Sequence, residues 1–557
     1  MAENAERIVT QYKRRVLARG VWESRWRSIA KFFMPHRSSH IGRTVGRTVT
    51  PGESQTEGLF DSTGIEASIM LAGFLWSGTT NPAIQWHSLK MRDDSLNRIQ
   101  SVGEWLEEST RRMMLARRQS NFYPQMFSAE HELVTFGTTA VFAEEIPIPR
   151  RGGFGGLSYR AYPIGTYVID ENKDGLVDVF QREFGMTARA AAQKWDAKNL
   201  TEDMKKAITD NQGDKSFAFL HSIHPREEFD SERRDSQNKP VSSVVLAKDG
   251  QGQKIIAEGG FEEFPVMVPR WEQTVGEAFG RGRGHVALPD AKTLNRLVEL
   301  ELMGLEISIV PPIIVKSEGV IGNISFVPGK STIVRDSVDQ DIGTFKVNPR
   351  LDLSTIQKED LKTSIRNQFF VNLLIQRSGV QPLTATEVLE RIQEQQRIIG
   401  PGYGRLESEL LDPMVDREFG IMLRAGALPP PPPEVIEAHL AGEAQIDVQY
   451  EGPLARAQRS QNVPALQRVV ELIGLASPLA PDVNDIVDWD EAVRETAIDL
   501  GLPMTYLRDP KTVELIRRVR AEAQQQQQSI DNIQEGLKAA GAGAPALELL
   551  EGRGVAA

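Results

Sequence analysis

The chain has 557 residues, of which 40% are hydrophobic and 25% charged, and its formal net charge is −11. A single hydrophobic core stops growing at about 250 to 300 residues, so we expect several modules. The absence of cysteine excludes disulfides, thiolate zinc sites and cysteine nucleophiles. The acidic balance argues against a general nucleic-acid coat, but not against a protein that surrounds nucleic acid without gripping it.

No run of uncharged apolar residues approaches the roughly 18 to 20 that a membrane-spanning helix needs. The first ten residues contain Glu3, Glu6 and Arg7, where a signal peptide would place its apolar region. We therefore expect a protein made and kept in a cytoplasm, or in an assembly derived from one, with no membrane partner.

The N-terminal segment is basic although the whole chain is acidic. Tyr12, Trp22, Trp26, Ile29 and Phe33 supply one face of a helix, so we expect an amphipathic basic helix. Its basic side is either a solvated surface or a site for phosphate groups or a partner protein. The basic residues are Lys13, Arg14, Arg15, Arg19, Arg25, Arg27, Lys31, Arg37, Arg43 and Arg47.

Three more helices are expected in the N-terminal quarter, at residues 58–76, 102–119 and 126–136. The first is rich in small residues, which permits another element to approach closely. The second carries four arginines beside its apolar face, which we interpret as a solvated basic side. These arginines are Arg111, Arg112, Arg117 and Arg118.

β-Strands are expected from about Leu157 onward. Residues 167–180 predict a hairpin around an acidic, glycine-ended turn. The turn resembles a calcium loop that begins at Asp170, but Gln181 stands where a bidentate glutamate should close the cage, so we interpret it as a plain turn. Short helices are expected at residues 187–194 and 201–208, and strands at residues 217–224, 242–248, 254–258 and 264–271.

The central part of the chain predicts two helices that flank a β-insert. A basic GRGRG segment at residues 280–284 lacks the acidic follow-up of a dinucleotide fingerprint, and we interpret it as a hinge or a turn into a helix that begins near Leu288. An apolar stripe from Leu294 to Ile309 has the period of that helix, and two prolines, Pro311 and Pro312, end it.

The insert contains a lookalike of a nucleotide-binding phosphate loop at residues 328–331. Ile324 stands where the motif requires its first glycine, so we reject an NTPase. A second helix restarts the apolar period at Leu361, until a glycine and a proline interrupt it. Thr384 and Glu387 form a capping box for a third, long helix, which we expect to be kinked at its GPGYG sequence.

The C-terminal part begins with a run of prolines at residues 429–433, which predicts a stiff linker. A short strand is expected at residues 446–450. Prolines separate three further helices, and an alanine- and glycine-rich tail is expected to lose order. The helices are expected at residues 454–475, 489–500 and 511–528, and the tail at residues 529–557.

Six sequences occur in order along the chain: DSTGIEASIMLAGFLWSGTTNP, YPIGTYVIDENKDG, FGRGRGHVALPDAKTLNRL, VPPIIV, TATEVLERIQEQQRIIGPGYGRLESELLDP and IDVQYEGPLARAQR. In this order, they resemble the portal proteins, the head-to-tail connectors of short-tailed, podovirus-type bacteriophages. No single motif is as specific as a metal tetrad, but together they follow the family order over roughly residues 14–520.

The resemblance implies an α+β, mainly helical portal fold with wing, stem, clip and crown regions, assembling into a ring. The wing would comprise residues 1–284, with a β-rich part at about 157–271. Two stem helices, at residues 285–310 and 354–377, would flank the clip at residues 311–353. The other regions would be a tunnel loop at 377–383, a kinked long helix and wing/crown connection at 384–452, crown helices at 453–528 and the tail.

The same resemblance implies roles for three groups of residues. It implies no catalytic residue, no metal and no cofactor. The DNA channel would be lined at the tunnel loop by Arg377, Ser378, Gly379 and Gln381. The clip contacts to a motor or adaptor would come from Lys316, Glu318, Lys330, Arg335, Asp336, Asp339 and Asp341. The stem contacts between subunits would come from Leu294, Val298, Leu302, Leu305, Leu361, Ile365 and Phe369.

The implied function is a channel at one capsid vertex through which double-stranded DNA is packaged and ejected. The implied partners are further copies of the chain, typically twelve in all, the DNA, the terminase large subunit, a tail adaptor, and the major capsid and scaffolding proteins. The protein would be found in the virion after assembly in the host cytoplasm. The alternatives are a tail adaptor or internal scaffold that contacts the portal, and a nucleic-acid-processing hydrolase, for which no credible carboxylate cluster is present.

Overall fold

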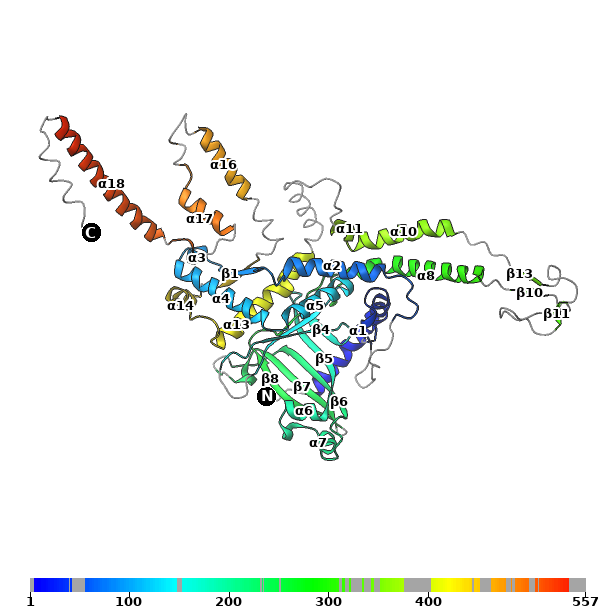
Figure 1. Cartoon of the computed structure of the whole chain (residues 1–557). Helices are drawn as coiled ribbons and strands as arrows, with labels where there is room; N and C mark the ends of the chain where they lie inside the picture. The colour runs from blue at the N-terminus through cyan, green and yellow to red at the C-terminus, as the bar shows by residue number, and fades with distance from the viewer. Residues whose placement is uncertain are drawn as a thin grey trace. The chain divides into compact units, whose positions relative to one another are not determined.

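The chain contains both helices and antiparallel sheets (Figure 1), which confirms the expected α+β class. It divides into two compact units, a larger one of Met1–Ser88, Ser109–Pro430 and Val448–Gln458, and a smaller one of Leu89–Glu108, Pro431–Asp447 and Arg459–Ala557. The computed structural model describes residues 5–39, 41–42, 56–147, 153–230, 233, 235–249, 252–309, 313–315, 320–321, 333–334, 342–344, 351–374, 402–442, 445–450, 462–476, 482, 486–499, 506–508 and 510–539.

The four helices expected near the N-terminus are confirmed. α2 begins at Thr63 rather than at residue 58. The Asp61 carboxylate, one residue before the N-cap Ser62, accepts a hydrogen bond from the Thr63 amide at 2.8 Å. Gly137, with φ of +88°, ends α5 in the left-handed conformation that glycine favours. The bounds are α1 Ala5–Phe33, η1 Pro35–Arg37, α2 Thr63–Thr79, α4 Gln100–Arg118 and α5 Phe122–Phe136.

The basic side of α1 is used partly inside the chain. Arg15 donates to the carboxylate of Asp170 at 2.7 Å, and Arg19 donates to the carbonyl oxygen of Tyr167 at 2.9 Å. These two arginines therefore form neither a solvated surface nor a site for a partner, because both bind groups of their own chain. Arg14 and Arg25 are exposed, so both interpretations stay open for them.

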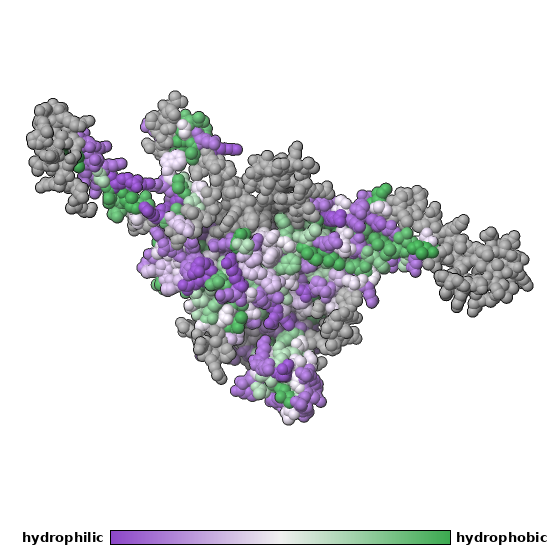
Figure 2. All heavy atoms as spheres, viewed as in Figure 1, coloured by the Kyte–Doolittle hydropathy of each residue, from purple (hydrophilic) through white to green (hydrophobic). Residues whose placement is uncertain are grey.

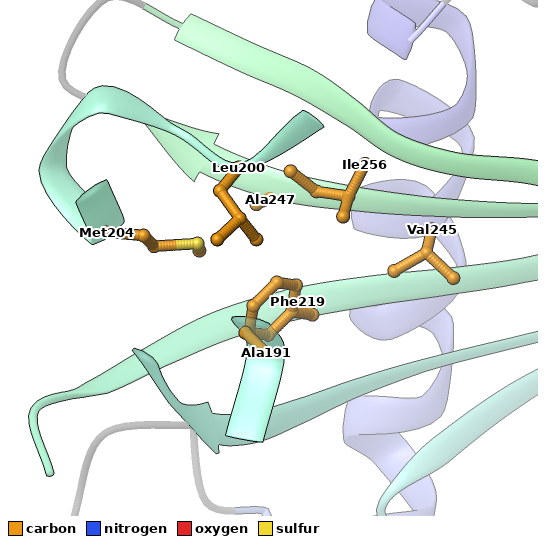
Figure 3. Packing of buried hydrophobic residues seen from close by; sticks show 7 residues of the cluster. All are labelled: Ala191, Leu200, Met204, Phe219, Val245, Ala247 and Ile256. Carbon is orange, nitrogen blue, oxygen red and sulfur yellow. The ribbon is translucent and has the colours of Figure 1, made fainter. Parts of the chain in front are cut away.

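A five-stranded antiparallel sheet has the order β4-β5-β6-β7-β8. Successive side chains of a strand point to opposite faces of the sheet, so the residues of these strands contribute alternately to two hydrophobic cores. Phe219 packs with α6 and α7 on one face (Figure 3), and the next residue, Leu220, packs against α1 on the other. The bounds are β4 Tyr167–Glu171, β5 Val177–Thr187, α6 Ala188–Lys194, η2 Ala197–Asn199, α7 Glu202–Thr209, β6 Ser216–Pro225, η3 Ser236–Asn238, β7 Val241–Asp249 and β8 Gly252–Phe261.

The acidic turn between β4 and β5 is organised by the chain's own groups. The Asn172 side chain accepts hydrogen bonds from the amides of Asp174 and Leu176, at 2.9 and 3.0 Å. Asp170 is held by Arg15, so its carboxylate already has a cationic partner. These contacts are those of a plain turn, as expected from the sequence.

A second sheet has the order β3-β2-β9, from β2 Ala140–Glu145, β3 Leu157–Tyr162 and β9 Val266–Met267. The strand expected at residues 264–271 is reduced to two residues. Pro265 and Pro269 flank it, and a proline has no amide hydrogen to donate to a neighbouring strand. Their carbonyl oxygens still accept bonds from Ala143 and Thr139 at 3.0 and 3.4 Å.

The interpretation of a solvated basic face on α4 is wrong for Arg117, which is completely buried. Its guanidinium lies 2.5 Å from the carboxylate of Glu418, which is also completely buried. The aromatic rings of Trp86 and Phe122 lie 4.6 and 5.5 Å from the same guanidinium. Arg118 next to it is exposed, as the sequence predicted.

The helices after the second sheet differ from prediction at their ends. α8 begins at Arg283 rather than near Leu288, and includes Pro289. The second stem helix, expected to continue to residue 377, breaks after Gln368 because Phe370 has a φ of +59°. The bounds are α8 Arg283–Ile309, α10 Leu351–Gln368, α11 Val371–Leu374, the π-helical turn η4 Glu407–Leu411 and α13 Asp412–Arg424.

The π-helical turn was not predicted. Pro413 follows it and cannot donate the amide bond that an α-helix would need at that position. Within the turn, the Glu409 carboxylate accepts a hydrogen bond from the amide of Arg270 at 2.8 Å, so the widened turn is tied to the end of the second sheet. π-Turns of this kind often mark functional positions in helices.

The smaller unit contains the C-terminal helices. The expected strand at residues 446–450 is present as β14, which pairs with β1. Each of these strands has residues in both units, since the division falls after Ser88 and after Asp447. α18 continues through residues 529–539, a correction to the expected disordered tail, because its run of glutamines is followed by further good helix formers. The bounds are β1 His87–Met91, α3 Asp94–Asn97, α14 Pro433–Leu440, β14 Ile446–Tyr450, α16 Asn462–Ala476, α17 Trp489–Asp499 and α18 Pro510–Ala539.

Among the helices of the described ranges, none is both long enough and apolar enough to cross a membrane.

Glu130 on α5 provides a test of this core. It is completely buried, and the Thr79 hydroxyl donates to its carboxylate at 2.9 Å. Burial raises the pKa of Glu130 from 4.5 to about 8, so unfolding releases a proton at intermediate pH and the free energy of unfolding falls as the pH rises from 4.5 to about 8. The glutamine in Glu130→Gln does not titrate. We therefore expect the free energy of unfolding of this variant, relative to that of the parent, to rise by about 1 kcal/mol or more between these two pH values, as measured by urea unfolding.

The control is Glu66→Gln, which changes an exposed carboxyl on α2. It should show no such gain. A difference between Glu130→Gln and the parent that stays constant with pH would contradict a neutral, buried carboxyl at this position.

Candidate functional site: a helical hairpin with two outer faces

α8 and α10 lie side by side and run antiparallel (Figure 1). In the second half of α8, Glu301 pairs with Lys358 in the first half of α10. Near its beginning, the Asp290 carboxylate accepts hydrogen bonds from Ser364 at 2.7 Å and from Gln368 at 2.9 Å. These contacts set the register of the hairpin.

The base of the hairpin is buried within the chain. Leu294, Ile365 and Phe369 are at most 1% exposed, and the Phe369 ring lies 5.4 Å from the ring of Phe33 on α1. The side chain of Asn295 donates to the carbonyl oxygen of Gly58 and accepts from the amide of Phe60. The hairpin is therefore anchored in the larger unit.

This burial corrects the stem residues expected at the subunit interface. Leu294, Ile365 and Phe369 are already covered within one chain, so they have no surface to offer a neighbour. Leu302 and Leu305, on the same stripe of α8, are 49% and 36% exposed. The remaining two, Val298 and Leu361, are half-buried.

The glycine-rich segment at residues 280–284 packs tightly against the end of α5. A β-carbon on Gly284 would lie 2.4 Å from the carbonyl oxygen of Thr135, and one on Gly282 would lie 2.5 Å from the amide nitrogen of Gly137. These approaches need glycine. Of the two interpretations of this segment, the close packing favours a turn into the helix over a hinge.

The outer face of α8 points away from α10. Its residues are spaced by three or four positions, as expected for one side of a helix. Basic residues lie near the base, and exposed apolar residues lie toward the far end. Figure 2 shows hydrophobic residues on the surface of the hairpin. This face, called the α8 outer face below, consists of Lys292, Arg296, Leu300, Met303 and Ile307.

The outer face of α10 has the opposite charge. Ile356 is 63% exposed near the beginning of the helix, and the rest of the face is polar or acidic. Arg283 lies beside the C-terminal end of α10, with its guanidinium 4.3 Å from the ring of Phe370. Arg283 and residues of α10 line a shallow groove. This face, called the α10 outer face below, consists of Ile356, Glu359, Asp360, Thr363 and Asn367.

The α8 outer face was not predicted, because the most regular apolar stripe of this helix is a different one, from Leu294 to Ile309. The first residues of that stripe are buried or half-buried within the chain. The available signal was a second stripe that starts with Lys292 and Arg296 and becomes apolar only from Leu300 onward. A face of mixed character is typical of contacts between subunits as well as of solvated surfaces.

The other expected site residues lie outside the described residues. In the insert, only backbone pairs are described, β10 Ile313–Val315 with β13 Ile342–Thr344, and β11 Val320–Ile321 with β12 Ile333–Val334. The residues outside the description are Lys316, Glu318, Lys330, Arg335, Asp336, Asp339 and Asp341 of the insert, Arg377, Ser378, Gly379 and Gln381 of the expected tunnel loop, and the capping box at Thr384 and Glu387.

Comparisons with known proteins identify the kind of chain that carries this hairpin. A probable portal protein of Bordetella phage BPP-1 is 28% identical over 546 residues, which cover 96% of this chain and 95% of that protein. A portal protein of Salmonella phage epsilon15 is 28% identical over 538 residues, covering 95% and 94%. A chain of the virion of a native gene transfer agent particle aligns over 80% of this chain and 93% of its own length, with 10% identity and a TM-score of 0.32, too low to support an argument.

A family model described as bacteriophage head to tail connecting protein matches residues 5–507. The match covers the hairpin, the sheets, the π-helical turn and most of the smaller unit. The chain therefore belongs to the family of bacteriophage head to tail connecting proteins.

Proposed function

We propose that the chain is a phage portal protein, which forms a ring-shaped channel at one capsid vertex through which double-stranded DNA is packaged and ejected. The observation that carries the proposal is the family match over residues 5–507. Two relatives of nearly the same length, both named as portal proteins, support it.

In this proposal, identical subunits, twelve as in the typical member, surround the DNA. α8 and α10 are the stem helices, and the clip, expected at residues 311–353, lies between them up to the start of α10 at Leu351. The clip docks the terminase large subunit during packaging and a tail adaptor afterwards. The wing and crown face the major capsid and scaffolding proteins, so the protein belongs to the capsid vertex of the virion.

The two outer faces of the hairpin support closure of a ring. A head-to-tail ring requires two different surfaces on each subunit, one for each neighbour. The α8 outer face and the α10 outer face belong to the two helices of one hairpin, whose register is set by contacts such as Glu301 with Lys358 and Asp290 with Ser364. Such a contact, repeated around the ring, buries apolar residues that a single chain leaves exposed.

The net charge is consistent with DNA that slides. Each phosphate that a protein neutralises adds nearly one unit to the salt dependence of DNA binding, and a ring multiplies each contact by its copy number. A chain with a net charge of −11 avoids holding the DNA in place.

Images of the purified full-length protein in negative stain test the proposal. We expect perforated rings with a mass near that of twelve 62.0 kDa subunits. A population that contains only monomers at all concentrations would overturn it and favour an enzyme. A compact assembly without a central hole would favour an adaptor or scaffold.

The tunnel-loop assignment makes a separate prediction. Arg377 in a ring would provide one cationic side chain per subunit to the DNA backbone, with weaker polar contacts from Gln381. We expect Arg377→Ala particles to package or retain less full-length DNA than the parent, as measured by DNA extracted from purified particles. The matched control is Arg233→Ala, an exposed arginine of the β-rich part. Equal DNA content in Arg377→Ala and parent particles would contradict this role.

A further inference from the structure

We propose that the α8 outer face of one subunit binds the α10 outer face of the next, with Arg296 paired to Asp360 of the neighbouring copy. This inference rests on the proposed function, because it requires a ring of identical chains. It specifies which residues meet and why the contact is head-to-tail.

The register of the hairpin places the two residues at a common level. Arg296 follows Asp290 by six residues, or about 9 Å at 1.5 Å per residue. On α10, Ser364 and Gln368 bind Asp290, and their midpoint is position 366. Asp360 precedes that position by six residues, which is the same distance along the helix. Measured from the pair of Glu301 and Lys358, the levels differ by about 4 to 5 Å, which is within the reach of an arginine side chain.

The apolar residues agree with the same register. Met303 lies two residues beyond Glu301, and Ile356 lies two residues before Lys358, so both are displaced equally from that pair. Each is largely exposed in the single chain, at 46% and 63%. In a cyclic ring, rotation carries one subunit onto the next without a shift along the axis, so a hairpin along that axis brings these levels together.

The charges of the two faces are complementary. The α8 outer face carries Lys292 and Arg296, with Glu299 next to Arg296 as its partner within the chain at 2.9 Å. The α10 outer face carries Glu359 and Asp360. Among the described residues, Asp360 has no ion pair.

Neighbouring groups on α10 leave the acidic character of its face in place. Lys362 lies 3.7 Å from Glu359 and 3.8 Å from Asp61, so its charge is shared between two acids. At the base, Lys292 reaches the level of Thr363 and Asn367, whose side-chain oxygens can accept its hydrogen bonds.

This charge pattern distinguishes a ring from a two-fold dimer. An isologous contact would place each outer face against a copy of itself, with Arg296 near Arg296 or Asp360 near Asp360. Like charges across an interface disfavour such a pairing. The head-to-tail contact instead brings the basic face onto the acidic one, and leaves both faces available to continue around the ring.

Charge reversal of the full-length protein tests the pairing. We expect Arg296→Glu and Asp360→Arg each to raise the subunit concentration for half-maximal ring formation by about tenfold or more, since a close interfacial charge pair contributes at least about 1.5 kcal/mol. The double variant restores the opposite charges and should return this concentration toward the parent value. Mass photometry of purified protein measures subunits and rings together.

The matched control is Arg233→Glu, because Arg233 is exposed like Arg296 and also pairs with an acid three residues away on its own segment. It should assemble as the parent does. Far-ultraviolet circular dichroism checks that every variant is folded, which is expected because Arg296 and Asp360 are exposed.

The outcomes separate this inference from the proposed function. Rings in the parent with unchanged assembly of both single variants would overturn the pairing only. Loss of assembly in the single variants without recovery in the double variant would also overturn it. A parent that forms no rings would overturn both the proposed function and the pairing.

Discussion

Replacing Arg117 by methionine should lower the free energy of unfolding by about 3 to 5 kcal/mol, because removal of one partner from a buried ion pair leaves the other charge uncompensated. Arg117 and Glu418 are both completely buried, and their nearest charged atoms are 2.5 Å apart. The Tyr159 hydroxyl donates to the second oxygen of Glu418 at 2.6 Å. Methionine keeps much of the volume between Trp86 and Phe122 but none of the charge.

The cation–π contact adds to this cost, whereas protonation of Glu418 limits it. The guanidinium lies against the rings of Trp86 and Phe122, so a cation–π contribution is lost together with the ion pair. Burial raises the pKa of Glu418, and Arg117 opposes that rise, so without Arg117 the carboxyl would take up a proton more readily. Chemical denaturation monitored by tryptophan fluorescence measures the change.

Arg118→Met is the matched control, since Arg118 is the exposed neighbour on the same helix. It should change the free energy of unfolding by no more than about 0.5 kcal/mol. The double variant Arg117→Met with Glu418→Leu should be more stable than Arg117→Met alone, because no charge is left buried. A cost below about 1 kcal/mol for Arg117→Met would show that the pair does not support the fold.

Replacing Gly137 by alanine should destabilise the chain by more than about 3 kcal/mol, because overpacking adds to the strain of a left-handed backbone. A β-carbon there would lie 2.2 Å from the carbonyl carbon of Arg281 and from the amide nitrogen of Gly282. Both contacts are with backbone, which cannot rotate away as a side chain can. The segment that precedes α8 would have to move, so ring formation should weaken as well.

Gly276→Ala separates the two causes. Gly276 also has a positive φ, of +85°, but a β-carbon there would meet nothing within 4 Å. Gly276→Ala should lower the free energy of unfolding only by the strain of the left-handed backbone, about 1 to 2 kcal/mol. Equal costs for the two alanine variants in the same denaturation experiment would contradict the role of close packing at Gly137.

Much of the local structure could be predicted from the sequence because it depends on neighbours in the chain. The hairpin at residues 167–180 follows from alternating side chains around a turn, and the Asn172 side chain closes it with bonds to nearby amides. α6 and α7 are capped by Thr187 and Thr201, whose hydroxyls accept hydrogen bonds from amides three residues later.

The predictions that were wrong depend on groups far away in the sequence. Arg117 is buried because Glu418 and Tyr159, 301 and 42 positions away, supply its partners, and α4 alone contains no sign of them. Leu294, Ile365 and Phe369 are interior residues because the base of the hairpin packs on α1. An apolar stripe has the same spacing whether it faces its own chain or another one.

The sequence by itself determined the α+β class, most of the helices and strands, and the order of motifs that places the chain among the phage connectors, because periodicity, capping and turn chemistry are local. The tertiary structure decided which face of α8 is free, which arginine of α4 is buried, and how α8 and α10 are aligned. Those properties arise from contacts such as Glu301 with Lys358 and Gly284 with Thr135, which exist only after distant segments have packed together.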